Sequence, residues 1–246
     1  MSQNVAATIS GRPVALERSP RSMNTFLVIW FGQLGLLTMF AFVNFSLAFH
    51  GALFTPLILS FSTEAVLGSV LSIGGFGLLA GSALMSAWGG ARRKMYSLLG
   101  AQFVFGLCIG LAGLRPNPVL IGAATFAFFA LLPIAQSSSQ AIWQAKVAPD
   151  VQGRVFAVRA LIANIATPLS YLLAGPLADK VFEPWMAPGG LLAGVVGTIT
   201  GVGAGRGIGL IFTVMGLSIT LATVVGFMNP RIRRVERELP DFTQSQ

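Results

Sequence analysis

The sequence predicts an all-α polytopic membrane protein built as a six-helix bundle. Hydrophobic residues fill 54% of the 246 positions and charged residues only 10%, whereas a soluble domain carries about 25% charged residues. The sparse charges separate long neutral runs, and a helix needs about 20 apolar residues to cross the hydrocarbon core. This composition excludes a disordered chain, a nucleic-acid-binding arm and an ordinary soluble enzyme.

Six neutral runs are long and apolar enough to span a bilayer. They must be helical, because lipid offers no partner for open backbone groups. The first run is longer than one span needs, so we expect a long or tilted helix whose start, 23–34, lies at the interface. Another apolar run, 184–205, holds seven glycines, and we assign it to an external Gly-rich loop, 179–206. The predicted spans are approximately 30–58, 65–88, 95–113, 118–142, 157–178 and 207–229.

The basic residues predict the orientation of these spans. With six spans, 13 of the 16 Lys and Arg residues lie at the two chain ends or in the loops 89–94 and 143–159. Cytoplasmic loops carry such an excess, so both termini are expected in the cytoplasm, with a bacterial inner membrane as the location. The net charge of +8 is therefore a topology signal and does not indicate a nucleic-acid partner.

The predicted organisation follows from these boundaries. A polar tail, 1–22, is expected to be disordered, and translation could start at Met1 or at Met23. The six-helix domain covers 35–230, and a basic cytoplasmic tail covers 231–246.

Small residues recur at spacings of four or five in two spans. Lipid tails are as apolar as leucine, so close backbone approach drives association of membrane helices. These positions indicate helix packing, or alternatively faces that slide in a transporter. They are Gly68, Ser72, Gly77 and Gly81 in the second span, and Gly106 and Gly110 in the third.

Polar side chains at membrane depth are costly and are candidates for function. We expect them to line the wall of a polar substrate cavity or, alternatively, to make hydrogen bonds between helices. His50, the single histidine, is either part of a proton relay or a hydrogen-bonded structural residue. The substrate-pathway candidates are Asn44 and His50 in the first span, Gln136, Gln140 and Gln144 on one face of the fourth, and Asn164 and Tyr171, with Thr167, on one face of the fifth.

Signals of catalysis are lacking. The sequence has no His-Glu-x-x-His, no P-loop and no paired carboxylates. The glycines of 201–207 resemble a dinucleotide loop only loosely, because no strand precedes them. The single cysteine, Cys108, excludes an internal disulfide framework and a cysteine-built metal site. We expect neither enzymatic activity nor a cofactor or metal.

Three motifs flank the predicted spans. Segment 81–94 contains Gly81, Gly89 and the basic cluster Arg92, Arg93 and Lys94, segment 149–155 contains Asp150, Gly153 and Arg154, and segment 174–179 contains Gly175 and Pro176. In this order they resemble the signature loop, the Gly-Arg loop and the Gly-Pro element of the major facilitator superfamily.

Within that superfamily the resemblance is greatest to siderophore, macrolide and other drug exporters, over residues 35–240. Ser86 stands where the family's signature has an aspartate, so the charge lock supplied by that aspartate is in doubt. Asp150 and Arg154 are four apart and can pair if a helix begins there.

The resemblance implies half of a transporter. The family has twelve helices in two halves that hold the substrate between them, and this chain matches the C-terminal half. Its segment 23–33 resembles the start of a first helix, which predicts an in-frame loss of most of the N-terminal half. One interpretation is a half-transporter that exports a small amphipathic molecule as a homodimer or with a separate N-terminal-half partner. The alternative is a truncated, non-transporting remnant or packing subunit, also embedded in the lipid bilayer.

Overall fold

The computed structural model describes residues 23–91, 93–147 and 149–229, and all regular structure in these ranges is helical. The predicted tails 1–22 and 231–246 lie outside this part of the chain. Residues 23–35 form the helical start of the first element, and a compact unit begins at Leu36. The packing described below belongs to the compact unit.

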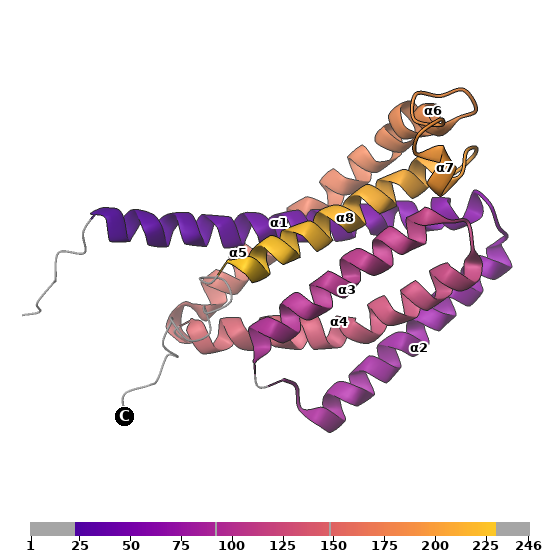
Figure 1. Ribbon diagram of the computed structural model, residues 1–246. Helices are drawn as coiled ribbons and strands as arrows, with labels where there is room; N and C mark the ends of the chain where they lie inside the picture. The colour runs from indigo at the N-terminus through magenta and orange to yellow at the C-terminus, as the bar shows by residue number, and fades with distance from the viewer. Residues whose placement is uncertain (1–22, 92, 148, 230–246) are drawn as a thin grey trace, which may run out of the picture. The chain divides into compact units, whose positions relative to one another are not determined.

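The six predicted spans are confirmed as six helices that are long and apolar enough to cross a membrane. Figure 1 shows them as the long elements of the fold. Three short helical pieces connect the last two of them: the π-helix η1 (Ala178–Phe182), α6 (Glu183–Met186) and α7 (Gly197–Thr200). The long helices are α1 (Met23–Leu59), α2 (Glu64–Trp88), α3 (Lys94–Leu114), α4 (Pro118–Lys146), α5 (Pro149–Leu177) and α8 (Arg206–Met228).

Two of the predicted loops are largely helical. In the expected loop 143–159, α4 continues to Lys146 and α5 already begins at Pro149. The Gln152 side-chain amide helps to end α4, because its Nε2 donates to the Gln144 carbonyl at 3.1 Å and to the Val147 carbonyl at 2.9 Å. Apolarity marks only the stretch that lipid surrounds, whereas a helix can continue beyond it with polar residues. Likewise η1, α6 and α7 occupy part of the expected loop 179–206.

Local chemistry explains several helix ends. Asn117 caps α4, since its Oδ1 accepts from the Val119 N–H at 2.9 Å and the Leu120 N–H at 3.2 Å, and Pro118 follows at the first helical position. Gly89 ends α2 with φ 73°, a left-handed conformation that glycine adopts without steric cost.

Glycines bring two pairs of helices into close contact: α2 with α4, and α3 with α8 (Figure 1). A Cβ at Gly77 would lie 2.5 Å from the Phe126 carbonyl oxygen, and one at Gly81 would overlap the Ala130 carbonyl. In α3, a Cβ at Gly106 would overlap Thr220 of α8. These three positions pack as the small-residue pattern predicts.

Other members of the predicted small-residue pattern do not pack in this way. A Cβ at Gly68 meets nothing within 4 Å, and the Ser72 hydroxyl donates to the Gly68 carbonyl of its own helix at 2.9 Å. Both residues are exposed. The spacing of small residues therefore predicts the contact face of α2 only in part, because the turn that holds Gly68 and Ser72 lies outside the contact with α4.

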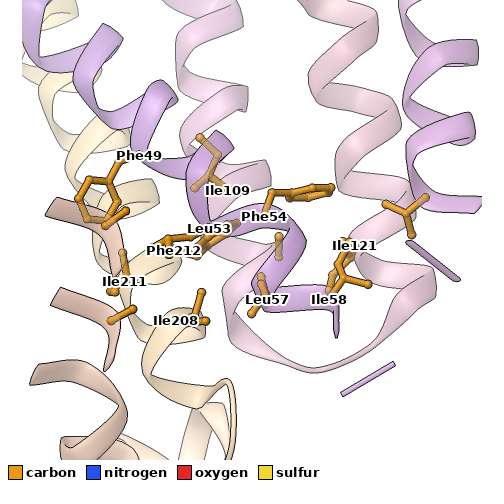
Figure 2. Close-up of a cluster of buried hydrophobic side chains, with 14 of the residues drawn as sticks. Phe49, Leu53, Phe54, Leu57, Ile58, Ile109, Ile121, Ile208, Ile211 and Phe212 are labelled. Carbon is orange, nitrogen blue, oxygen red and sulfur yellow. The ribbon is translucent and has the colours of Figure 1, made fainter. Parts of the chain in front are cut away.

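α1 packs through large side chains. Leu53 and Leu57 lie among side chains from α3, α4 and α8, including Ile109, Ile121 and Phe212 (Figure 2). Leu57 and Ile121 are fully buried. The main hydrophobic core of the compact unit is thus built around the C-terminal half of α1.

The chain after α5 is anchored against the start of α8. Pro176 lies at the end of α5, and the Glu183 N–H then donates to the Ala178 carbonyl, which is the wide turn of a π-helix. The Glu183 carboxylate accepts from the Gly205 N–H at 3.2 Å and the Ile208 N–H at 3.0 Å. A carboxylate is favourable at a helix N-terminus, so Glu183 caps α8 from a distant segment.

Candidate functional site

The predicted glutamine face of α4 lies on the surface of the compact unit. Gln136, Gln140 and Gln144 are all exposed, while their neighbour Ser138 is buried. α4 buries its opposite side against α2 and α3. The three amides therefore point out of this bundle, and the described residues do not close a cavity around them.

Arg159 of α5 joins that helix to α4 beside the glutamines. Its Nη2 donates to the Ser139 hydroxyl at 3.1 Å, and its guanidinium carbon lies 4.6 Å from the centre of the Trp143 ring. A cation over a tryptophan face at this distance is attracted to the ring. From the sequence alone, Arg159 counts only among the basic residues of the loop 143–159; the spacing of Ser139 and Trp143 on one face of a helix is the signal that could have placed it against α4.

The predicted polar face of α5 is also exposed. Asn164, Thr167 and Tyr171 lie on the surface of the compact unit, and Tyr171 is 59% exposed. Of the six spans, α5 is the least buried. It contacts α1 through Ser170, whose buried hydroxyl donates to the Phe45 carbonyl at 3.1 Å.

His50 is separated from these surface residues and lies inside the bundle. Its ring centre is 4.8 Å from that of Phe212, 5.3 Å from that of Phe54 and 5.8 Å from that of Phe128. It also lines a cavity of about 310 Å³ between α1, α2, α3 and α4. Asn44, the other candidate in α1, is half-buried. The pathway candidates thus divide into an exposed group on α4 and α5 and a group on α1.

The motif between α2 and α3 is only partly involved in packing. Gly81 contacts α4 and Gly89 ends α2, whereas Ser86 is exposed on the last turns of that helix. The guanidinium carbon of Arg93 lies 5.6 Å from the Tyr96 ring centre. Arg92 lies outside the described residues.

The two motifs of α5 lie at its opposite ends. Gly153 and Arg154 are exposed in the first turns, and the Asp150 side chain is outside the described part, so its pairing with Arg154 stays a prediction. Gly175 and Pro176 lie in the last turn before η1. Proline lacks a backbone donor, so Pro176 leaves the last turn of α5 one hydrogen bond short just before η1.

Comparisons with known proteins find one distant likeness. The chain is 26% identical over 107 residues to macrolide efflux protein A of Streptococcus pyogenes and, with the same figures, to the protein of that name in its serotype M6 strain ATCC BAA-946 / MGAS10394. The matched region is 43% of this chain and covers 26% of those relatives. No family model matches the chain, and no solved structure matches it.

The helices and this likeness agree on the class of protein. Six membrane-length apolar helices make the chain a multi-pass membrane protein. The distant relative is named as an efflux protein.

Proposed function

We propose that the chain is one half of a membrane efflux transporter of the major facilitator type. In this proposal it exports a small amphipathic molecule, and it does so as a homodimer or together with a separate half. The likeness to macrolide efflux protein A supports the efflux part of the proposal. Alternating access requires two bundles that rock against each other around the substrate, and one six-helix chain supplies only one of them. The proposal therefore requires a partner.

The exposed polar faces of α4 and α5 carry the proposal. Gln136 and Gln140 lie on one membrane-length helix and Asn164 on another, and all three amides are exposed. Amides facing lipid would be costly, so such residues normally face a protein interior or a water-filled cavity. A second bundle covering these faces would supply that environment and would turn them into the wall of a substrate pathway.

The prediction for Gln140 tests this pathway. The Gln140→Leu variant is expected to lose most transport of a fluorescent amphipathic dye in proteoliposomes, at unchanged expression, because leucine has no hydrogen-bonding group to hold a polar substrate. Gln102→Leu, a half-buried glutamine of α3, is the matched control and is expected to transport normally. Export by Gln140→Leu at the native rate would remove this residue from the pathway.

The oligomeric state is measured on the same material. In mild detergent the native chain is expected to run as a dimer, or to copurify with a second membrane protein. A six-helix monomer whose proteoliposomes move no dye would exclude the transporter and favour the packing subunit or remnant.

The proposed orientation places both termini in the cytoplasm of a bacterium. A green fluorescent protein fused after Gln246 is expected to fluoresce, and alkaline phosphatase fused there to be inactive, because each reporter works on one side of the membrane only. Fusions after Asn117, in the connection between α3 and α4, are expected to give the reverse pattern. Active phosphatase at the C-terminus would contradict the six-span orientation.

A further inference from the structure

The cavity beside His50 has the size of a ligand site. Its volume is about 310 Å³, at the lower end of the range of about 300–1,000 Å³ for small-molecule pockets. An apolar cavity of about 150 Å³ already holds benzene. The space in this bundle therefore accommodates a molecule of about two fused rings.

The cavity opens at the surface of the bundle. Gly51 and Thr55 of α1 and Leu71 of α2 line it and are exposed, so they form its rim. Phe54 and Ile109 line the inner part and also belong to the main hydrophobic core (Figure 2). A ligand can thus enter from the rim and come to rest against tightly packed side chains.

Aromatic rings dominate the inner wall. The rings of His50 and Phe128 stack at 22° to one another, and Phe129 meets Phe128 edge to face at 5.4 Å between centres. Aromatic faces prefer to receive another ring in an offset-stacked or edge-to-face arrangement. The lining favours an aromatic occupant.

The polar groups limit the charge of the occupant. Among the described residues that line the cavity there is no Asp, Glu, Lys or Arg. The His50 imidazole makes ring contacts but no hydrogen bond within the described part of the chain, and a neutral imidazole offers one donor and one acceptor. An ion would remain uncompensated there, whereas a neutral hydrogen-bonding group would find a partner in His50 or in the hydroxyl groups of Thr55 and Thr125, which also line the cavity.

We propose that this cavity is a binding site for a neutral, planar aromatic molecule with a single hydrogen-bonding group, of which 1-naphthol is a suitable probe. The ring stacks against His50 and Phe128, and the hydroxyl bonds to the His50 imidazole. The site lies within one chain and needs no second bundle. It goes beyond the proposed function and holds whether or not the chain transports anything.

Cys108 provides a built-in reporter. It lines the cavity, is buried and is the single cysteine of the chain. The full chain in lipid nanodiscs is labelled with N-ethylmaleimide, and the rate is followed by intact-protein mass spectrometry. At ten times its Kd, 1-naphthol is expected to slow the labelling about tenfold, because only the unoccupied fraction reacts. Naphthalene, which lacks the hydroxyl, is expected to bind about fivefold more weakly.

Variants at the rim locate the site. Gly51→Phe is expected to label slowly and to be insensitive to 1-naphthol, since the new ring blocks the entrance; a Cβ at Gly51 meets nothing within 4 Å, so the core is undisturbed. Thr55→Phe blocks the same rim and is the second variant. The control is Gly100→Phe on α3, which also has open space around its Cβ and does not line the cavity, and it is expected to behave as the native chain does.

Two results would overturn the proposal: native Cys108 labelling that 1-naphthol does not slow, or protection by 1-naphthol that persists in both rim variants. In His50→Phe the preference for 1-naphthol over naphthalene is expected to disappear; its persistence would exclude His50 as the hydrogen-bond partner. No transport is measured in these experiments, so their failure and the failure of the proposed function are independent results.

Discussion

Replacing Gly216 by alanine is expected to destabilise the bundle strongly. A Cβ at this position of α8 would lie 2.5 Å from the Gly106 carbonyl oxygen and 2.5 Å from the Gly110 Cα of α3. Both neighbours are backbone atoms, so no flexible side chain can move aside and the two helices must separate. Overpacking of this kind costs about 1–3 kcal/mol, and we expect a value near the upper end.

Gly110→Ala is the matched control for this substitution. A Cβ on Gly110 would meet its nearest atom, the Gly216 Cα, at 3.8 Å, an ordinary contact. Alanine also favours a helix over glycine by about 1 kcal/mol, so Gly110→Ala should keep or raise the melting temperature in detergent while Gly216→Ala lowers it. Equal melting temperatures for the two variants would mean that α3 and α8 are not in backbone contact.

The second large effect is expected at Glu183. Arg206 is only 4% exposed, its Nη1 donates to the Thr200 carbonyl at 2.9 Å, and its Nη2 has no hydrogen-bond partner in the described part of the chain. The Glu183 carboxylate is close enough for its charge to act on this guanidinium. It also accepts two backbone N–H groups of α8, from Gly205 and Ile208.

Glu183→Ala therefore removes the counter-charge and both acceptors at once. Leaving buried donors without an acceptor typically costs about 1–3 kcal/mol, and the loss of the nearby opposite charge adds to this, so we expect a clear loss of thermal stability in detergent. Asp179→Ala is the control, because Asp179 is exposed in η1 one turn earlier, and it should have little effect. Stability equal to the native chain in Glu183→Ala would contradict the role of this carboxylate.

A double variant separates the charge effect from the lost hydrogen bonds. Glu183→Gln removes the charge but keeps one acceptor oxygen, and its effect should be partly reversed by adding Arg206→Gln, which removes the orphaned guanidinium. Because the two residues interact, their effects are expected to be non-additive. Simple additivity of the two substitutions would show that the charges are not coupled.

The membrane-spanning part of the fold is predictable because its physics is local. Each span depends on the apolarity of its own residues, so the gaps between charges located all six helices. The helix ends were less predictable: α4 and α5 extend into polar sequence, since a helix needs internal hydrogen bonds and not lipid. The glycines of 187–205 predicted a loop, and they did not reveal that part of this segment is helical.

The arrangement of the candidate residues was only partly predictable. Helical periodicity placed Gln136 and Gln140 on one face, but it could not tell whether that face points into the bundle or out of it. The surroundings of His50 come from α4 and α8, far along the chain, as the contacts with Phe128 and Phe212 show. A single sequence without known contacts contains no signal that joins these residues.

The π-helical turn of η1 sets the direction in which the following chain leaves α5. An α-helix turns by roughly 100° with each residue, so the extra residue that a π-turn accommodates changes the azimuth of everything after it. Glu183 follows this turn directly, and its carboxylate reaches the start of α8. With a regular α-helical turn the same side chain would point roughly 100° away from α8. The count of residues in this one turn, and not only their identity, thus determines whether the carboxylate reaches the Gly205 and Ile208 N–H groups at the start of α8.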